Sequence, residues 1–391
     1  MNEISDILNR GVSDVIVKKD LEKKLKSGKK LRIKFGIDPT GSSLHIGHAV
    51  ILRKLRSFQE MGHQILFLIG TFTARIGDPT GKTEVRKVLT KEQIDKNIRD
   101  YKKEASKILD LDKTKFYENH EWLEFMSFSE LIQVSQSFTV SQMMERDMFQ
   151  ERVKKDLPIS LHEFFYPLMQ GYDSVILKAD LEIGATEQTF NLLAGRTLQK
   201  SFGEKPQDIM TMPVLEGTDG KEKMSKSLDN FIGLSESPRE MFGKTMSIPD
   251  ELIIKYFELC TNLSLKEISD IEKALNKGEN PRDAKIRLAK ELVKIYHSEN
   301  DATGAEKEFL EMFQKKGVPD EIPTFSFQGE KGIVDIIYEA KLCSSKSDVR
   351  RLIDQNAVSI DGEKTKDKNL SLSCGDQVLK VGKRKFLKLV I

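Results

Sequence analysis

The pattern of apolar and polar positions in residues 31–83 predicts a strand, a helix and a second strand. Residues 31–37 alternate as a strand does, and the apolar periodicity of 44–61 is that of an amphipathic helix, which Gly62 would end. The continuous apolar run at 65–69 is typical of a buried parallel strand. We therefore expect one right-handed crossover unit, with a ligand site where the first strand passes into the helix.

The rest of the pattern predicts an α/β protein built in several segments. Helices are expected at 3–30, 91–109, 130–138 and 140–155, and strands at 116–118, 181–184 and 208–216. Helix-start residues then recur from Ser237 onward, before a linker that contains proline and glycine. The expected segments are a Rossmann-like parallel-sheet domain with a helical insert at 1–232, a helical domain at 233–318, a linker at 319–332 and a small α+β domain at 333–391.

The composition is that of a globular protein with more than one core. Its 391 residues exceed one ordinary core, and 38% of them are hydrophobic against 32% charged. No apolar run is long enough to span a membrane, and the first residues lack the pattern of a signal peptide. The scattered Cys260, Cys343 and Cys374 form no metal or disulfide pattern, so we expect a cytoplasmic location and no membrane partner.

The net charge of +2 conceals a basic C-terminal segment. Residues 331–391 contain 13 lysines and arginines and 8 acidic residues, so they carry +5 and the preceding chain carries −3. Basic side chains gather on a helix expected at 344–353 and in a hairpin expected at 378–386. RNA backbone is the expected partner, and a small solvated domain without a ligand is the alternative. The candidate contacts are Lys346, Arg350, Arg351, Lys383 and Arg384.

Two histidines lie at the expected start of the first helix. His45 and His48 are three residues apart, so they share a face in the first turn, where free N–H groups and the helix dipole favour an anion. Gly47 between them has no side chain, so a flat ligand could approach the backbone closely. A phosphate attached to a stacked base fits this arrangement, and two ordinary surface histidines are the alternative.

Two other motifs are disfavoured. The segment at 77–83 resembles a Walker phosphate loop, but only three residues separate Gly77 from Gly81 where that loop has four. The pair His45 and His48 has no cysteine or carboxylate at ligand spacing, so it is a poor zinc signature. We therefore expect no protein-bound metal.

A helix expected after Ser160 carries three polar side chains on one face. Ser160 and Glu163 have the spacing of a capping box. Tyr166, Gln170 and Asp173 follow at intervals of four and three, which places them on the same side of the helix. These groups could bind a small polar molecule or could form a solvated helix face.

Two further segments follow the carboxyl ends of expected strands, where such sheets bind ligands. Gln188 follows the strand at 181–184, and the polar loop 217–227 follows the last strand of the first domain. Lys223 and Lys226 lie three apart in that loop among small residues. Cations on a flexible lid suit phosphate oxygens, whereas a solvated surface run is the common alternative.

Together these motifs resemble those of class I aminoacyl-tRNA synthetases. Residues 43–48, Ser-Leu-His-Ile-Gly-His, match the HIGH motif, and 223–227, Lys-Met-Ser-Lys-Ser, match KMSKS. Within that class the whole chain resembles the tyrosyl-tRNA synthetases. The supporting residues are Asp38-Pro39-Thr40, Gly77-Asp78-Pro79-Thr80 and the spacing of Tyr166, Gln170 and Asp173. The tail resembles the alpha-L RNA-binding module of bacterial members, and 233–318 corresponds to their helical anticodon-binding domain.

The resemblance implies a two-step reaction. The carboxylate of tyrosine attacks the α-phosphate of ATP, giving tyrosyl-adenylate and pyrophosphate, and a ribose hydroxyl at the 3′ end of tRNA(Tyr) then takes the tyrosyl group. Because the attacking carboxylate is already ionised, catalysis needs positioning and charge stabilisation rather than a base. The implied partners are L-tyrosine, ATP with Mg²⁺, tRNA(Tyr) and a second copy in a homodimer, with no further cofactor.

The resemblance also implies a role for each motif residue. The catalytic contacts to phosphate fall to His45, His48, Lys82, Arg86, Lys223 and Lys226. The ATP site includes both histidines and Lys226, together with Gly36, Asp38, Thr40, Gly47 and Met224. The tyrosine site consists of Asp173 for the phenolic hydroxyl and of Asp78, Tyr166 and Gln170 for the ammonium group, with Gln188 in support.

Three residues depart from the family pattern. In one branch a tyrosine that helps to hold the phenolic hydroxyl stands at the position of Lys34, whereas a second branch carries basic residues there. Ala185 and Glu187 replace the more usual glycine and aspartate before Gln188, so an extra methyl group and a longer acid change the pocket floor.

Three alternatives stay open at this stage. The tryptophanyl relative shares the fold, but Asp173 and the Gly-Asp-Pro-Thr run argue against it. A nucleotidyltransferase with a His-x-Gly-His motif would have no use for an RNA-binding tail. A synthetase-like scaffold that binds RNA without chemistry would not need His45, His48, Lys223 and Lys226 intact.

Overall fold

The computed structural model describes residues 3–41, 43–80, 90–314, 322–327, 329–343, 345–373, 377–382 and 385–390. The chain divides into two compact units, Met1–Thr303 and Gly304–Ile391. This division falls inside a helix of the C-terminal half, and the finer domain boundaries given above stay predictions.

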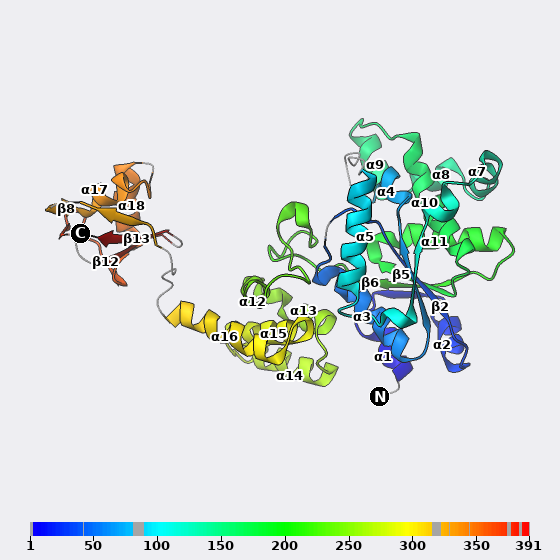
Figure 1. Cartoon of the computed structure of the whole chain (residues 1–391), viewed down its shortest axis with the longest axis horizontal. Coiled ribbons are helices and arrows are strands. Elements are labelled where there is room, and N and C mark those ends of the chain that lie inside the picture. Colours follow the sequence, from blue (N-terminus) through cyan, green and yellow to red (C-terminus); the bar gives the residue numbers. More distant parts are fainter. Residues whose placement is uncertain are drawn as a thin grey trace. The chain divides into compact units, whose positions relative to one another are not determined.

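A six-stranded sheet forms the centre of the first unit (Figure 1). Its strands are β1 (Asp14–Ile16), β2 (Arg32–Ile37), β3 (Gln64–Ile69), β4 (Thr114–Glu118), β5 (Leu181–Ala185) and β6 (Asp208–Met212). They lie in the order β1-β6-β5-β2-β3-β4, and all pairs are parallel except β1 with β6. The chain moves outward from β2 in one direction and from β5 in the other. The crevice between β2 and β5 is therefore the switch point at which such sheets bind ligands.

The first crossover helix covers one face of this sheet. Helix α3 (Ile46–Glu60) turns Leu52, Leu55 and Phe58 inward, and each of these side chains is fully buried. Strand β3 is buried on both faces, from Ile65 to Ile69, as its continuous apolar sequence predicts. The strand, helix and strand expected at 31–69 are confirmed.

The other helices up to residue 201 follow in chain order. They are α1 (Glu3–Asn9), α2 (Lys18–Lys26), α4 (Thr73–Ile76), α5 (Lys91–Ala105), α6 (His120–Leu123), α7 (Phe128–Ser135), α8 (Val140–Met144), α9 (Asp147–Lys154), α10 (Phe165–Ile176) and α11 (Thr189–Ser201). Short 3-10 turns precede two of them, η2 (Leu161–Phe164) before α10 and η3 (Thr186–Gln188) before α11. Helix α3 connects β2 to β3 and helix α11 connects β5 to β6, so the two crossovers run in opposite directions along the sheet. The two helices therefore cover opposite faces of the sheet (Figure 1).

Helices α10 and α11 approach each other closely at two glycines. A Cβ atom on Gly171 of α10 would lie 2.9 Å from the carbonyl carbon of Ala194 in α11, and one on Gly195 of α11 would lie 2.9 Å from Oγ of Ser174 in α10. Both distances are shorter than Cβ contacts tolerate. These glycines therefore set the spacing of the two helices.

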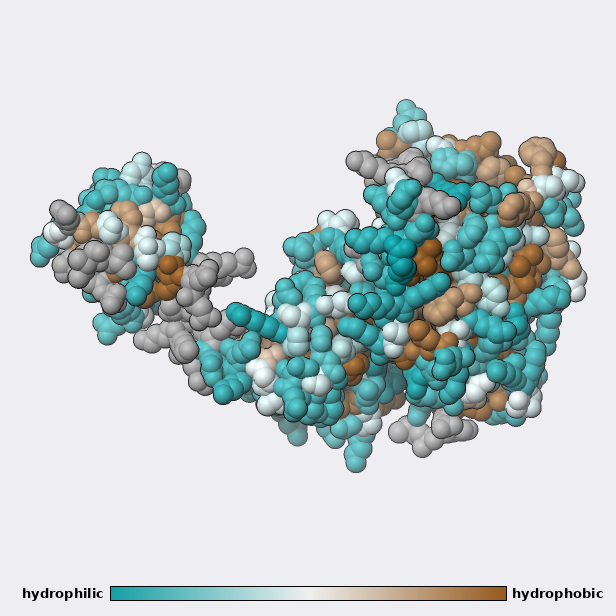
Figure 2. All heavy atoms as spheres, viewed as in Figure 1, coloured by the Kyte–Doolittle hydropathy of each residue, from teal (hydrophilic) through white to brown (hydrophobic). Residues whose placement is uncertain are grey.

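The insert α6–α9 exposes apolar side chains. Phe125, Phe128 and Val140 are 79%, 77% and 74% exposed, and Ile132 is also exposed. Figure 2 shows brown, hydrophobic residues at the upper right of the molecule, where Figure 1 places α7 and α8. A surface of this kind is typical of an interaction site.

Helices follow the sheet through the C-terminal part of the first unit. They are α12 (Pro238–Met246), α13 (Ile253–Cys260), α14 (Leu265–Asn276), α15 (Pro281–Tyr296) and α16 (Glu299–Gln314), of which α16 crosses the division between the units. Arg53 of α3 donates a hydrogen bond to the carbonyl oxygen of Thr261, just after α13. Among the described residues, no helix is long and apolar enough to cross a membrane.

The second unit is a small α+β fold. It contains β7 (Thr324–Ser326), β8 (Glu330–Gly332), α17 (Ile333–Glu339), α18 (Lys346–Asp354), β9 (Val358–Ile360), β10 (Glu363–Lys364), β11 (Ser371–Ser373), β12 (Gln377–Val381) and β13 (Lys385–Val390). A five-stranded sheet has the order β10-β9-β12-β13-β7, and β8 pairs with β11. Ile336, Val349 and Leu379 are fully buried in its core.

Several element boundaries differ from the sequence-based expectation. The segment expected to be helical at 3–30 also contains strand β1, which is only three residues long and takes its pairing from β6. The strand expected at 208–216 ends at Met212, because Pro213 has no N–H for the sheet. The helix expected from 91 ends at Ala105 rather than 109. The stretch at 140–155 is two helices, because Arg146 between them is extended.

Candidate active site

A cavity of about 570 Å³ opens at the carboxyl ends of β2 and β5. Its volume is that of a small-molecule site. All the described residues that the sequence analysis assigned to phosphate, ATP or tyrosine line it. They are Gly36, Asp38, Thr40, His45, Gly47, His48, Asp78, Tyr166, Gln170, Asp173, Gln188, Lys223, Met224 and Lys226. Segments far apart in the chain therefore meet in one crevice.

The two histidine rings pack against each other at the start of α3, with their planes tilted by 43°. Their centroids are 3.9 Å apart, and the backbone N–H of His45 donates to Nδ1 of His48 at 3.3 Å. Burial lowers the pKa of His48 to about 4 and that of His45 well below its ordinary value, and the nearby Lys226 lowers both further. Both imidazoles are therefore neutral at pH 7, so they act as hydrogen-bonding groups rather than as fixed positive charges.

Gly47 leaves the space that the histidine pair needs. A Cβ atom at this position would lie 3.0 Å from both Cε1 and Nδ1 of His45. A side chain here would push that ring aside and also fill the cavity wall. The glycine therefore keeps backbone open to a ligand next to the imidazoles.

The loop at 217–227 brings two lysines to the same cavity. The ammonium group of Lys223 is 2.9 Å from the carboxylate of Glu187, at the start of α11. The ammonium group of Lys226 is buried and has no hydrogen-bond partner among the residues that the structure describes. Desolvation lowers the pKa of Lys226. An anion entering the cavity would give this ammonium group the partner it lacks.

A second carboxylate lies deep in the cavity. Asp173 of α10 is 1% exposed and accepts hydrogen bonds from Nε1 of Trp122 at 2.8 Å and from Nδ2 of Asn119 at 3.3 Å. Burial raises the pKa of Asp173 to about 7, although Lys34 and the two hydrogen bonds act in the opposite direction. A buried acceptor with fixed donors on one side is suited to bind a hydroxyl on the other.

The other polar groups of the cavity are also held by neighbours. The hydroxyl of Tyr166 donates to Oδ2 of Asp38 at 3.0 Å, and Thr73 donates to Oδ1 of Asp38 at 2.7 Å. The carboxylate of Asp78 accepts from Nε2 of Gln188 at 2.7 Å. These hydrogen bonds fix the orientation of the cavity's carboxylates before any ligand arrives.

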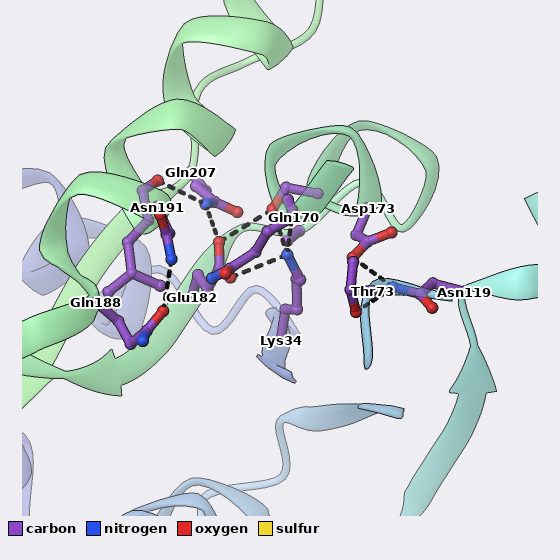
Figure 3. Close-up of polar contacts among 12 residues, drawn as sticks. Lys34, Thr73, Asn119, Gln170, Asp173, Glu182, Gln188, Asn191 and Gln207 are labelled. Atoms are coloured by element: carbon purple, nitrogen blue, oxygen red, sulfur yellow. Dashed lines mark hydrogen bonds and ion pairs between the residues drawn. The ribbon is translucent and has the colours of Figure 1, made fainter. Parts of the chain in front are cut away.

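Lys34 does not line the cavity, although two of the residues that it contacts, Gln170 and Glu182, do (Figure 3). It is fully buried, and its ammonium group contacts Glu182 at 2.9 Å, the hydroxyl of Ser174 at 2.8 Å and the carbonyl oxygen of Gln170 at 2.9 Å. An ammonium group has three donors, and all three are used here. Lys34 therefore supports α10 and β5 and has no donor left for a ligand.

Some predicted residues cannot be placed. Lys82, Arg86, Lys383 and Arg384 lie outside the described residues. In the second unit, Lys346 pairs with Asp335 at 2.6 Å and Arg351 pairs with Asp348 at 3.0 Å, while Arg350 is exposed. These three residues belong to the second unit, whereas the cavity belongs to the first.

Comparison with known proteins identifies the family of the chain. The model of the family "tRNA synthetases class I (W and Y)" matches residues 26–314, and that of the "Tyrosine--tRNA ligase SYY-like C-terminal domain" matches 314–388. A tyrosine–tRNA ligase of Carboxydothermus hydrogenoformans is 49% identical, over 98% of this chain and 97% of its own length. The chain belongs to the tyrosyl-tRNA synthetase family.

Other members of this family also match most of the chain. A tyrosine–tRNA ligase of Thermotoga maritima is 48% identical to this synthetase, over 98% of the chain and 96% of its own length. Among solved structures, a truncated mitochondrial tyrosyl-tRNA synthetase of Aspergillus nidulans has a TM-score of 0.67 at 23% identity and covers 80% of this chain and 94% of its own. The tyrosyl-tRNA synthetase of Archaeoglobus fulgidus has a TM-score of 0.63 at 23% identity, over 78% of this chain and 98% of its own. These two likenesses confirm the α/β fold.

The sequence analysis of this synthetase missed the residues that hold the ligand-facing groups. Trp122 and Asn119 orient Asp173, while Arg146 and Asn191 form hydrogen bonds behind the cavity. Only Trp122 had a visible signal, because it is the single tryptophan of the chain. Within the described ranges, no group of three or more histidine, cysteine, aspartate or glutamate side chains is placed to hold a metal ion.

Proposed function

We propose that this chain is a tyrosine–tRNA ligase that converts L-tyrosine and ATP to tyrosyl-adenylate and pyrophosphate and then transfers the tyrosyl group to the 3′-terminal ribose of tRNA(Tyr). The observation that carries the proposal is the shared cavity, in which the histidine pair and the two loop lysines meet Asp173 and Asp78. The full-length similarity to tyrosine–tRNA ligases supports the same assignment. Because tRNA charging serves translation, we assign the enzyme to the cytoplasm.

The histidine pair and the two lysines would act on the triphosphate. His45 and His48 are neutral, so they would donate hydrogen bonds to phosphate oxygens without paying for a buried charge. Lys226 would contribute its buried ammonium group, which no described residue pairs, and Lys223 would join it after leaving Glu187. Both lysines stabilise negative charge that grows on the departing pyrophosphate, so they lower the barrier of the first step.

The rest of the ATP site surrounds the histidine pair. We assign the adenine face to Gly47, where the backbone is open, and the remaining contacts to Gly36, Asp38, Thr40 and Met224. Mg²⁺ would arrive with ATP and stay bound to its phosphates. We also assign phosphate contacts to Lys82 and Arg86, on the strength of the family resemblance alone.

The tyrosine side of the cavity would read both ends of the amino acid. Asp173 would accept the phenolic hydroxyl, because Trp122 and Asn119 already fix its carboxylate. Phenylalanine would leave this acceptor unpaired, which can cost on the order of 10⁵ in specificity, a figure whose worked example is itself a tyrosyl-tRNA synthetase. The ammonium group would be bound by Asp78, Tyr166 and Gln170, with Gln188 in support.

The C-terminal unit would bind tRNA(Tyr). Its match to the C-terminal domain of tyrosine–tRNA ligases supports this role, as does the net charge of +5 over 331–391. We assign backbone contacts to Lys346, Arg350, Arg351, Lys383 and Arg384, and anticodon contacts to the helical segment 233–318. Its affinity for tRNA should therefore fall with rising salt concentration.

The exposed apolar side chains of the insert support a homodimer. Phe125, Phe128 and Val140 would lose their contact with water at an interface between two copies. Phe128→Glu should shift sedimentation from dimer to monomer. Leu265→Glu, at an exposed apolar position of α14 outside the insert, is the matched control and should leave the dimer intact. A monomeric wild-type chain at micromolar concentration would rule out this interface.

Amino-acid-dependent exchange between ATP and pyrophosphate tests the function. We expect exchange with tyrosine and none with tryptophan or phenylalanine under the same conditions. Exchange driven by tryptophan would favour the tryptophanyl relative. An intact fold that exchanges with none of the three would favour an RNA-binding scaffold.

A further inference from the structure

Hydrogen bonds join five side chains, one of which is Asp78, in a closed ring, and we call this set the Asp78 ring. Nη2 of Arg146 donates to Oγ1 of Thr80 at 3.0 Å and to Oδ1 of Asn191 at 3.2 Å. Thr80 donates to Oδ1 of Asp78 at 2.6 Å, and Gln188 donates to Oδ2 of Asp78 at 2.7 Å. Asn191 closes the ring by donating to Oε1 of Gln188 at 2.8 Å. Figure 3 shows Gln188 and Asn191 facing each other.

Counting only contacts with residues that the structure describes, the ring leaves Asp78 with one open acceptor position. Oδ1 receives two hydrogen bonds, from the backbone N–H of Thr80 at 2.9 Å and from its hydroxyl. Oδ2 receives one, from Gln188. A carboxylate offers about four acceptor positions, so the open one belongs to Oδ2. Asp78 and Gln188 line the cavity, whereas Arg146 does not.

Burying the charged side chain of Arg146 carries a desolvation penalty. It is 5% exposed and lies between two aromatic rings, with its guanidinium carbon 4.9 Å from the ring centre of Phe190 and 5.4 Å from that of Phe149. Its Nε and Nη1 atoms have no hydrogen-bond partner among the described residues. Desolvation lowers its pKa, and the charge of Asp78 acts in the opposite direction. An apolar side chain could fill the same space, so the charge and the several N–H donors of the guanidinium group indicate a role beyond packing.

We propose that Arg146 is a positioning residue for the ammonium group of the amino-acid substrate. It holds Thr80 and Asn191, which hold the two oxygens of Asp78, so the open acceptor position of Oδ2 keeps a fixed direction. This proposal rests on the function proposed above, in which Asp78 binds that ammonium group. It assigns specificity for an α-amino group to a residue that touches no substrate atom.

The test compares ligands that differ in the ammonium group. Tyrosine and tyramine carry it, whereas desaminotyrosine keeps the phenol and the carboxylate but lacks it. Calorimetric titration of Arg146→Lys should give dissociation constants for tyrosine and tyramine roughly tenfold higher than wild type, and less than about twofold higher for desaminotyrosine. Equal weakening of all three, or of none, would overturn the proposal.

Matched variants separate this effect from general loss of structure. Arg152→Lys makes the same change at another buried arginine of the insert, which pairs with Glu163 and lies outside the ring. It should alter the three dissociation constants by one common factor. Thr80→Val breaks the ring at a second place and should reproduce the ammonium-dependent loss, whereas Thr80→Ser, which keeps the hydroxyl, should restore binding.

The outcomes also separate this proposal from the function beneath it. If wild type binds none of the three ligands and shows no tyrosine-dependent exchange, the proposed function fails. If wild type binds all three but the ring variants show no preference for ammonium-bearing ligands, only the role of Arg146 fails. Should Arg146→Lys not fold, Thr80→Val decides by the same comparison.

Discussion

The ammonium group of Lys223 lies 2.9 Å from both carboxylate oxygens of Glu187. The two side chains are 43% and 34% exposed, so this ion pair is worth less than about 1 kcal/mol. If Lys223 binds ATP as proposed, ATP must compete with Glu187 for it. The free protein holds this lysine on the wall of the cavity.

Breaking this pair should favour ATP modestly. We expect Glu187→Gln to lower the KM for ATP by up to roughly fivefold in the exchange assay, which corresponds to the upper value for an exposed pair. The difference from wild type should shrink as salt concentration rises. Glu222→Gln, which removes a carboxylate from the same loop, is the control. A higher KM for ATP in Glu187→Gln would show that the carboxylate binds the nucleotide instead.

Lys226→Ala should slow adenylate formation and leave tyrosine binding nearly unchanged. Its ammonium group is buried and has no hydrogen-bond partner within the described part of the chain, so its removal breaks no described hydrogen bond and the melting temperature should not fall. Loss of one preorganised charge at the phosphates should reduce the rate by roughly 10²-fold or more, measured by single-turnover kinetics. Lys221→Ala on the same loop is the control. An equal loss in tyrosine affinity would contradict this role.

Asp173→Asn should change protein stability in a pH-dependent way and weaken tyrosine binding at every pH. Because the pKa of Asp173 is about 7 rather than 3.8, the folded free enzyme binds this proton more tightly than the unfolded chain does. The contribution of Asp173 to the free energy of unfolding is therefore present below about pH 4 and is lost as the pH rises to 7.

The variant does not titrate at this position. We expect its melting temperature to match wild type below about pH 4 and to exceed it at pH 8, while tyrosine affinity falls sharply at both. Thermal unfolding at the two pH values measures the first effect and calorimetry the second. A variant that is less stable than wild type at pH 8 would show that the carboxylate is stabilised as an anion.

Lys34→Met should destabilise the first unit strongly. Its removal leaves Glu182 buried without its charged partner, so the free energy of unfolding should fall by roughly 3–5 kcal/mol. Adding Glu182→Gln should recover most of this loss in urea unfolding. Lys29→Met, which breaks a pair with Asp180 whose lysine is 57% exposed, should cost less than about 1 kcal/mol. A small cost for Lys34→Met would mean that water reaches Glu182.

Deleting 331–391 should spare the first reaction and weaken the second. The cavity belongs to the unit that ends at Thr303, so tyrosine-dependent pyrophosphate exchange should keep its rate. The basic excess of the tail is lost, so the KM for tRNA should rise, and the more so at physiological salt than at low salt. Unimpaired charging at physiological salt would remove the tail from the mechanism.

The sequence alone predicted the groups that face the cavity better than those that hold them. His45, His48, Lys223 and Lys226 lie in short motifs whose spacing is legible in one dimension, and all four meet in the structure. Arg146 showed no such signal, because its partners lie 66 and 45 residues away and the ring exists only in the folded chain.

Secondary-structure elements were also predictable where the signal is local and not where it depends on distant residues. Strand β3 was predictable because five consecutive apolar residues admit few alternatives, whereas β1 is three residues long and exists only by pairing with β6. The burial of Lys34 could not be expected from its neighbours in the sequence. It depends on Glu182 of the neighbouring strand β5 and on Ser174 of α10, which come together only in the folded chain.

The close approach at Gly171 and Gly195 limits how the specificity of this enzyme can be redesigned. The helix that carries Tyr166, Gln170 and Asp173 touches the backbone of its neighbour, so it cannot retreat to admit a bulkier amino acid. A laboratory seeking to load tRNA with a non-natural residue would have to gain room by shortening side chains. Libraries that keep both glycines and vary the side chains around them should therefore yield active clones far more often than libraries that vary the glycines.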